Sequence, residues 1–410
     1  MPKEGHVSME DLKIEFGYSA SPSSLYFFTK EENAFREKIR KFFQKDIAKL
    51  AEEAERENSN EPIQKAIKIM GAEGINQLYF PKEVGGKGYG ITMRTIRGEE
   101  LAAVSYAIAM GCGTSTDLFG MPVAHHGNLE QKKKYLKPIM DGKKIGGIAI
   151  SEPTGGCDAV GGMRTKAEKK GDEYIISGEK RFITNGSTAD YILLYAITNP
   201  KVDPQKGITA FVFETDVDGF EVVKDYQLMG RYGTINSHLR FNKCRVPAEN
   251  VLGRENEGFK IMMGGLDGER ISGTSGYVGC ARSAFEIALK YAGERMQFGQ
   301  PIRRFEGVSF KLSEMYAKLE AMRLLMLRAA RMIDAGLPAS KEAAAAKFFS
   351  ADVGWEIVDN ALQIVGGIGY TKEYPVERYM RDFRVGRIAA GSSEILRFLV
   401  QRELYREIGY

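Results

Sequence analysis

The hydrophobic periodicity of this chain changes twice, and these changes constrain its fold more than any single motif. Between residues 28 and 145 apolar residues recur at helical spacing, as in the stripe that contains Phe35, Ile39 and Phe43. From Ile145 short runs of β-branched and aromatic residues alternate with Gly, Asp and Pro turns. From Glu257 the helical spacing returns. The order α, β, α predicts an α+β protein.

A chain of 410 residues is too long for one compact core. We expect a polar N-terminal arm (1–27), an N-terminal α-helical domain (28–145), a middle β-barrel or β-sandwich domain (146–252) and a C-terminal α-helical domain (253–410). The last domain is predicted to be a four-helix bundle. Its helices are expected at residues 258–297, 306–335, 340–364 and 392–408.

Charge and composition exclude several classes of protein. The net charge is +4 with both signs interspersed, which gives no support for a nucleic-acid surface. No stretch approaches the ~20 apolar residues that span a bilayer, and no signal-peptide core is seen, so we expect a cytoplasmic protein without a membrane span. The four cysteines are widely separated and only four histidines are present, so neither a disulfide framework nor a metal site is predicted. Chemistry by an organic cofactor is the natural alternative.

Glu269 is the candidate catalytic base. It lies in the proline-free run 258–297, so it is expected to project from a helix. The commoner fate of a Glu-Arg pair such as Glu269 and Arg270 is a solvated helix face. Five glycines within thirteen residues argue for a ligand close to this backbone, because each costs roughly 1 kcal/mol inside a helix. These glycines are Gly264, Gly265, Gly268, Gly273 and Gly276.

Four further segments could bind a ligand, although each also has a purely structural interpretation. The turn 151–158 and the segment 182–186 offer backbone N–H groups, small side chains and an aromatic face, but they could be a simple turn and a buried Phe. Arg295 and Phe298 could bind a phosphate and an adenine, or the arginine could cap a helix C-terminus. The glycines at 366–369 could contact phosphate or form a C-cap.

Together these segments resemble the acyl-coenzyme A dehydrogenase family over more than nine tenths of the chain. The resemblance rests on seven features in register: the α, β, α order and six sequence motifs. The motifs are Ser-Glu-Pro within 151–158, Phe-Ile-Thr-Asn-Gly at 182–186, Leu-Asp-x-Glu-Arg at 266–270, Arg-x-Gln-Phe-Gly at 295–299, Gly-Gly-x-Gly-Tyr at 366–370 and Glu-Tyr-Pro-Val-Glu-Arg-Tyr-x-Arg-Asp at 373–382.

The resemblance implies an FAD-dependent homotetramer that oxidises an acyl-CoA thioester and passes electrons to an electron-transferring flavoprotein. It implies cofactor-binding roles for several residues: Ile150, Ser151, Cys157, Phe182, Thr184, Ser392 and Glu394 in one subunit, and Arg295, Phe298, Gln363 and Gly367 from a neighbouring subunit. It implies substrate-binding roles for Cys157, Asp267, Arg270, Ala389, Gly391 and Gly98.

The placement of the base distinguishes this chain from most of the family. The commonest pattern near the C-terminus is Tyr-Glu-Gly-Thr-Ser-Glu, in which the first Glu is the base, whereas this chain has Ala389 and Ala390 there. A minority of the family, including isovaleryl-CoA dehydrogenases, has the base at the position of Glu269. The resemblance therefore implies Glu269 as base and the backbone N–H of Ala390 as a donor to the thioester carbonyl.

The missing Tyr and Glu side chains predict a pocket that is wide beside the reacting carbons. We expect a branched, cyclic or aryl-substituted acyl-CoA as substrate. Arg94 and Arg97 leave open the alternative that the substrate carries a second carboxylate. We nevertheless expect each arginine to be exposed at the surface. An enoyl-CoA reductase, an oxygen-using oxidase and a non-catalytic flavin- and CoA-binding relative remain alternatives.

Overall fold

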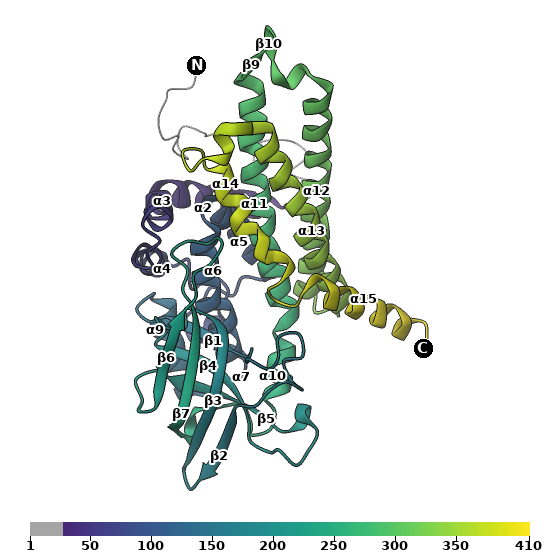
Figure 1. Cartoon of the computed structure of the whole chain (residues 1–410). Helices are drawn as coiled ribbons and strands as arrows, with labels where there is room; N and C mark the ends of the chain where they lie inside the picture. The colour runs from purple at the N-terminus through teal and green to yellow at the C-terminus, as the bar shows by residue number, and fades with distance from the viewer. Residues whose placement is uncertain (1–27) are drawn as a thin grey trace.

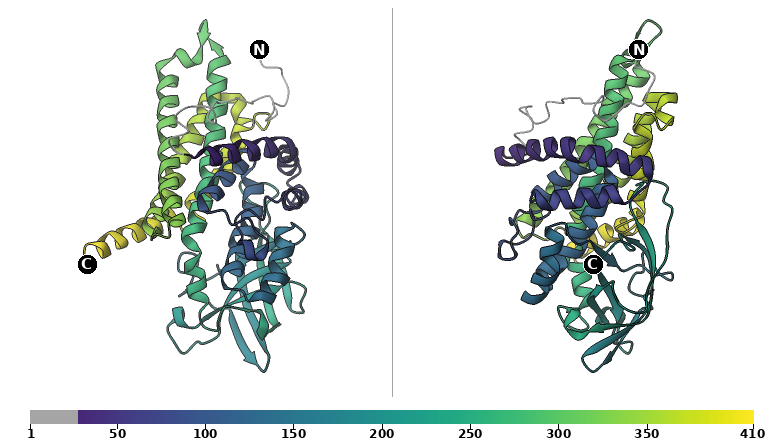
Figure 2. Two further views of the ribbon diagram at one scale, coloured as in Figure 1. Left: turned by 180° about the vertical axis from the view of Figure 1, so that it is seen from behind. Right: turned by 90° about the vertical axis from the view of Figure 1, so that its left-hand side faces the viewer.

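The computed structural model describes residues 28–410 and has three parts in the order α, β, α (Figure 1). The predicted arm at 1–27 lies outside the described residues. The β part occupies one end of the molecule, and the long C-terminal helices extend away from it (Figure 2). Within residues 28–410 no helix has the length and apolarity needed to cross a bilayer, and no cluster of His, Cys, Asp or Glu could hold a metal ion.

The N-terminal part is helical, as predicted. Its helical spacing is interrupted at Ser105, whose extended backbone ends one helix while its side chain caps the next by accepting a hydrogen bond from the Ile108 N–H. Its elements are α2 (Lys30–Phe42), α3 (Ala48–Glu57), α4 (Glu61–Ala72), α5 (Ile91–Val104), α6 (Tyr106–Gly113), α7 (Met121–His126), α8 (Leu129–Gln131) and α9 (Lys137–Met140), with π-helical turns at Phe43–Ile47, Thr114–Gly120 and Lys132–Leu136.

The middle part is an eight-stranded sheet in the order β6-β7-β3-β2-β4-β5-β8, with β1 paired in parallel to β4. Alternating burial, as in β3, shows that one face of these strands packs inward. The strands are β1 (Gly146–Ala149), β2 (Lys166–Lys170), β3 (Glu173–Thr184), β4 (Tyr191–Ile197), β5 (Ile208–Glu214), β6 (Phe220–Asp225), β7 (Asn236–Pro247) and β8 (Val251–Leu252). β3 continues to Thr184 and therefore includes the first residues of the segment 182–186.

The C-terminal part is built on three long helices. The predicted helix at 258–297 is broken at Gly265, so that Glu269 lies in the first turn of a new helix, α11. The elements are α10 (Gly258–Gly264), α11 (Leu266–Glu294), the hairpin β9 (Met296–Gln297) and β10 (Gln300–Pro301), α12 (Glu306–Asp334), α13 (Ser340–Val365), α14 (Val376–Phe383) and α15 (Ser393–Glu407). α15 points away from the other helices (Figure 1) and exposes Phe398 and Leu404.

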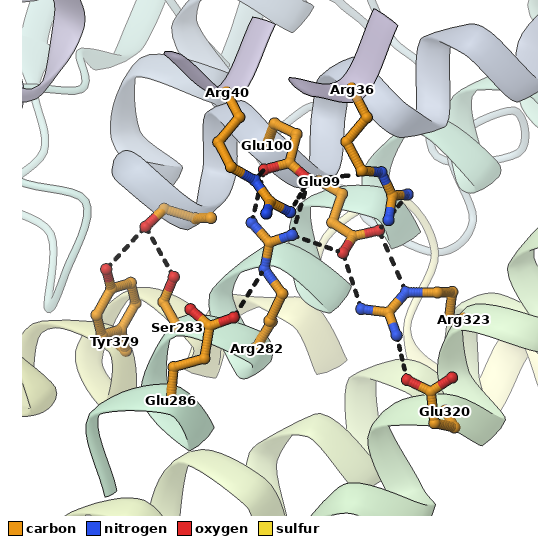
Figure 3. Close-up of polar contacts among 11 residues, drawn as sticks. Arg36, Arg40, Glu99, Glu100, Arg282, Ser283, Glu286, Glu320, Arg323 and Tyr379 are labelled. Carbon is orange, nitrogen blue, oxygen red and sulfur yellow. Dashed lines mark hydrogen bonds and ion pairs between the residues drawn. The ribbon is translucent and has the colours of Figure 1, made fainter. Parts of the chain in front are cut away.

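Helix α5 joins the two helical parts. Its buried Glu99 and Glu100 accept hydrogen bonds and ion pairs from α2, α11 and α12 (Figure 3). Gly98 permits the close approach of α5 and α11, since a Cβ there would lie 2.0 Å from the Ser275 hydroxyl oxygen. The two helical parts consequently share one hydrophobic core.

Candidate active site

A cavity with about 730 Å³ of space, part of it open to solvent, lies between α5, α6, α11 and the segment before α15. Its lining is mostly apolar, which is typical of a small-molecule site. Glu269, Ala389, Ala390 and Gly98 all line it, so the structure brings together four of the residues selected from the sequence.

Glu269 enters this cavity as a carboxyl group without a partner. No hydrogen bond or ion pair to it is found within residues 28–410. Part of its surface is accessible from the cavity, yet the surrounding protein desolvates the carboxylate. Burial raises the pKa of Glu269 to about 7, against the opposing effect of the cations Arg270 and Arg94. Such a carboxyl group can accept a proton near neutral pH.

The Ala389–Gly391 segment contributes Ala389 and Ala390 to the lining of the same cavity. Ala390 has a left-handed backbone (φ 56°), which is uncommon for a residue other than glycine, and Gly391 follows at φ 83°. No acceptor within residues 28–410 is bonded to the Ala390 N–H. A free backbone donor therefore lines the same cavity as the free carboxyl group.

Lys347 of α13 supports this segment, and its role was missed from the sequence. Its fully buried ammonium group donates to the carbonyl oxygens of Gly386 (2.8 Å) and Gly391 (2.6 Å). Burial lowers the pKa of Lys347 to about 8, so the charged form still predominates at pH 7. A single lysine in a helical run gives no sequence signal for such a contact.

The glycines around Glu269 only partly have the role inferred for them. A Cβ at Gly264, Gly265 or Gly273 would meet nothing within 4 Å, so the space beside them is free for a ligand. Gly276 is different, because a Cβ there would lie 2.8 Å from the ring of Tyr106. Close packing against Tyr106 accounts for that glycine within the protein itself, and Gly276 also lines the cavity, so the inference of a ligand beside it stays a prediction.

Asp267 and Arg270 lie on the first turn of α11, outside the set of residues that lines the cavity. The guanidinium group of Arg270 donates to Asp267 at 3.1 Å, and the single Ser340 hydroxyl donor lies within 2.8 Å of both Asp267 carboxylate oxygens. The Nε of Arg270 is buried without an acceptor. One donor of this pair is thus left unsatisfied within residues 28–410.

The predicted exposure of Arg94 and Arg97 is wrong. Both line the cavity and are only 4% and 3% exposed, because α5 turns this face toward α11. Arg94 pairs with Asp117 at 3.0 Å and donates to Ser272 at 3.2 Å. Asp117, buried at the end of the cavity, is a site residue that the sequence did not reveal.

The residues expected beside the flavin meet at one edge of the sheet. The Arg181 N–H donates to the carbonyl oxygen of Ser151, which brings the turn after β1 against the end of β3. Phe182 has a left-handed backbone (φ 60°) and a side chain that is 63% exposed. Ile150 precedes Ser151 and Thr184 ends β3, and both are half-buried.

This edge is held by a buried ion pair that the sequence did not indicate. The ammonium group of Lys180 donates to Glu152 at 2.8 Å and to the carbonyl oxygen of Ile150 at 3.1 Å. Beside it, Asn236 donates to the Phe182 carbonyl oxygen, but its own amide oxygen is buried without a donor. The Phe182 ring stacks on Tyr226 but stays largely exposed. An exposed aromatic ring and an unpaired buried acceptor fit a flat, hydrogen-bonding ring system such as a flavin.

Cys157 and Ser392 come from different parts of the chain and lie together. Cys157 is exposed, and its Sγ is 3.7 Å from the Ser392 hydroxyl oxygen. Ser392 is also the N-cap of α15, and Glu394 is exposed in the first turn of that helix. The turn of the β part therefore meets the segment that carries Ala390.

The remaining cofactor candidates lie at the far end of the molecule. Arg295 follows the last residue of α11, about 39 Å along the helix from Glu269. Phe298 is 92% exposed in the β9–β10 hairpin (Figure 1). Gln363 and Gly367 are exposed near the end of α13, which starts beside α11 at the Ser340–Asp267 contact. Within one chain these four residues do not join the cavity.

Three family models cover most of the chain. The acyl-CoA dehydrogenase N-terminal domain matches residues 29–143, the middle domain residues 147–244 and the C-terminal domain residues 256–405. An acyl-CoA dehydrogenase of Bacillus subtilis (strain 168) is 38% identical over 92% of this chain and 98% of its own. A mitochondrial isovaleryl-CoA dehydrogenase of Oryza sativa subsp. japonica is 36% identical, with 95% and 94% coverage.

The structure of butyryl-CoA dehydrogenase from Megasphaera elsdenii superposes with a TM-score of 0.87 at 35% identity, covering 92% of this chain and 99% of that one. The chain belongs to the acyl-CoA dehydrogenase family, a family of FAD-binding oxidoreductases. The predicted three-domain fold, the enzyme class and the cofactor are thereby confirmed.

Proposed function

We propose that this acyl-CoA dehydrogenase uses Glu269 to remove the α-proton of a branched, cyclic or aryl-substituted acyl-CoA, giving the 2-enoyl-CoA. The proposal rests chiefly on one observation: an unpaired carboxyl group with a pKa of about 7 lines the cavity. Its ionised form can accept the proton from Cα, and the C–H electron pair becomes the double bond as hydride leaves Cβ. FAD, when bound, supplies the hydride acceptor at N5.

The α-proton of a thioester is weakly acidic, so the enolate that forms must be stabilised by hydrogen bonds to its oxygen. Ala390 lines the same cavity as Glu269, and no acceptor within residues 28–410 is bonded to its N–H. Lys347 holds the carbonyl groups on either side of this residue and thereby orients the N–H. We assign Ala390 the role of carbonyl donor and Lys347 that of a positioning residue.

The proposed substrate class follows from the width of the cavity beside Glu269. Ala389 and Ala390 present only methyl groups there. A straight acyl chain would leave a void, and unfilled apolar volume costs roughly 24 cal/mol per Å³. A branch or a ring on the acyl group would fill this space.

Binding of FAD is proposed to involve two subunits. Ile150, Ser151, Phe182 and Thr184 would contact the ring system, with Cys157, Ser392 and Glu394 near it. Arg295, Phe298, Gln363 and Gly367 are exposed at the far end and can serve only the cofactor of another subunit. We therefore propose a homotetramer that passes electrons to an electron-transferring flavoprotein.

Two alternatives remain for the same site. The same groups would serve an enoyl-CoA reductase in the opposite direction, and a non-catalytic relative would bind flavin and CoA without turnover. The unpaired carboxyl group favours a catalytic role, because an unused buried carboxylate would cost stability.

The test is anaerobic reduction of the flavin by branched, cyclic, aryl-substituted and straight-chain acyl-CoAs, in the parent protein and in Ala389→Tyr. Bulky substrates should bleach the flavin fastest in the parent, and the tyrosine should reduce their kcat/KM by at least about tenfold through overpacking. Faster bleaching by butyryl- or octanoyl-CoA in the parent would contradict the substrate class. Absence of bleaching with every thioester would favour the non-catalytic alternative.

A further inference from the structure

Two guanidinium groups enter the cavity from α5, one helical turn apart. Those of Arg94 and Arg97 lie 6.0 and 5.8 Å from the ring centroid of Tyr79. Both side chains are almost fully buried. Two buried like charges repel each other, and each carries a desolvation penalty of several kcal/mol unless an anion compensates it.

Within residues 28–410 one carboxylate forms an ion pair with these two cations, and that carboxylate is occupied. The other carboxyl group of the cavity, Glu269, forms no ion pair and has a raised pKa. Asp117 pairs with Arg94 at 3.0 Å. Its two oxygens also accept hydrogen bonds from the hydroxyl groups of Ser272 (2.8 Å) and Thr116 (3.0 Å). Arg97 makes no ion pair with any residue in 28–410.

Arg97 has only a neutral partner. Its Nη2 donates to the Sγ of Cys112, and burial raises the pKa of that thiol, so Cys112 stays uncharged at pH 7. The Nε of Arg97 is buried with no acceptor. The hydroxyl group of Thr114, which lines the same cavity, is also buried without a hydrogen bond. This end of the cavity therefore has an excess of donors and of positive charge.

The other face of α5 shows how this protein compensates buried charge. There, four arginines are matched by four glutamates in one network (Figure 3). The members are Arg36, Arg40, Arg282, Arg323, Glu99, Glu100, Glu286 and Glu320. Because the fold balances one face of α5 within the protein, an unbalanced cation on the face that lines a ligand cavity points to an anionic ligand group.

We propose that the substrate carries a second, free carboxylate, which Arg97 and Arg94 bind at the end of the cavity. This inference rests on the proposed function and narrows its substrate class to dicarboxylic acyl-CoA thioesters. The carboxylate would accept hydrogen bonds from the unpaired Arg97 donors and from Thr114. It would supply the missing negative charge.

The position of the arginines limits the length of the acyl group. Arg94 donates to Ser272, which lies three residues after Glu269 on α11, about 4.5 Å along the helix axis. The free carboxylate must therefore lie close to the carbons that react at Glu269. A branched, cyclic or aryl-substituted acyl group with a main chain the length of succinyl or glutaryl meets this condition, whereas a long dicarboxylic chain does not.

The first experiment uses the parent holoenzyme and needs no variant. kcat/KM is measured for glutaryl-CoA, its ω-methyl ester and pentanoyl-CoA, and for succinyl-CoA beside butyryl-CoA. kcat/KM should be about 10- to 100-fold higher for the free acids than for the ester and the monocarboxylic thioesters. This factor corresponds to the free energy of one hydrogen bond to a charged group. Equal or better turnover of the ester and the monocarboxylic thioesters would overturn the inference.

The second experiment assigns the preference to Arg97. Arg97→Met should abolish the preference for the free acid, and Arg97→Lys, which keeps the charge, should retain part of it. Arg36→Met is the matched control, since Arg36 is equally buried but belongs to the network in Figure 3. The preference should survive in that variant. An unchanged preference in Arg97→Met would contradict the assignment.

A binding measurement distinguishes failure of this inference from failure of the proposed function. Dissociation constants of the same thioesters are measured from flavin absorbance in Glu269→Gln, which is expected to bind without turnover. Tighter binding of glutaryl-CoA than of its ester supports the carboxylate site. Full turnover in Glu269→Gln would overturn the proposed base and leave the carboxylate site supported, whereas indiscriminate binding would overturn only the carboxylate site.

Discussion

The buried ammonium group of Lys347 donates a hydrogen bond of 2.6 Å to the carbonyl oxygen of Gly391, the residue after Ala390. A second bond, to Gly386, fixes the other end of the same segment. The left-handed backbone of Ala390 is thus held by a side chain from a different helix. A strained residue at a ligand cavity persists only where its surroundings impose the conformation.

Replacing Lys347 by Met should therefore displace the Ala390 N–H. Each carbonyl group left without a donor costs about 1–3 kcal/mol, so the melting temperature should fall by several degrees. The rate constant of flavin reduction should fall by about tenfold or more, while flavin content is retained. Lys341→Met is the control, because this lysine of α13 pairs only with glutamates near the surface. Unchanged reduction in Lys347→Met would refute the positioning role.

The raised pKa of Glu269 predicts the pH dependence of catalysis. The base must be ionised, so kcat/KM should rise about tenfold per pH unit below pH 7 and level off above it. The measurement is the initial rate of anaerobic flavin reduction between pH 5.5 and 9 on the best substrate of the panel. A profile that is flat down to pH 5.5 would show that another group accepts the proton.

The same pKa makes a prediction about stability. A carboxyl group whose pKa is higher in the folded than in the unfolded state destabilises the fold as pH rises from about 4.5 to 7, and the penalty is complete above pH 7. Glu269→Gln removes this penalty. Its melting temperature should exceed that of the parent at pH 8 and approach it at pH 5. A variant that is less stable at pH 8 would contradict the desolvated state of Glu269.

Arg295 should couple flavin binding to assembly. It is exposed at the end of α11 far from the Glu269 cavity, and we propose that it contacts the cofactor of another subunit. Arg295→Ala should lose most of its flavin on gel filtration and elute as smaller species at micromolar protein. Arg303→Ala, in the turn after the β9–β10 hairpin, is the control. Full flavin occupancy in an intact tetramer would remove Arg295 from the cofactor site.

The sequence predicts the parts of this protein that depend on local patterns. The α, β, α order follows from hydrophobic periodicity, and a proline-free run places Glu269 in a helix. The break at Gly265 and the interruption at Ser105 were missed, because both depend on how the flanking helices pack. Element type is a local property, whereas element boundaries depend on tertiary contacts.

Residues of the site could be predicted from the sequence only where they belong to a recognisable motif. Glu269 and Ala390 stand in recognisable segments, but Lys347, Asp117 and the Glu152–Lys180 pair act through contacts between residues far apart in the chain. Arg94 and Arg97 were expected at the surface because most arginines are. Their burial depends on Gly98, which lets α5 approach α11.

The central claim is that Glu269 accepts the α-proton. The most direct test is stopped-flow measurement of anaerobic flavin reduction in Glu269→Gln, which keeps the size of the side chain but cannot accept a proton. Glu286→Gln is the matched control, since Glu286 is a second α11 carboxyl group whose pKa is raised by burial but which pairs with Arg282 outside the cavity. The account predicts that reduction slows by at least about 100-fold in Glu269→Gln, with FAD still bound, and changes little in Glu286→Gln. Reduction of Glu269→Gln at the rate of the parent protein would contradict it.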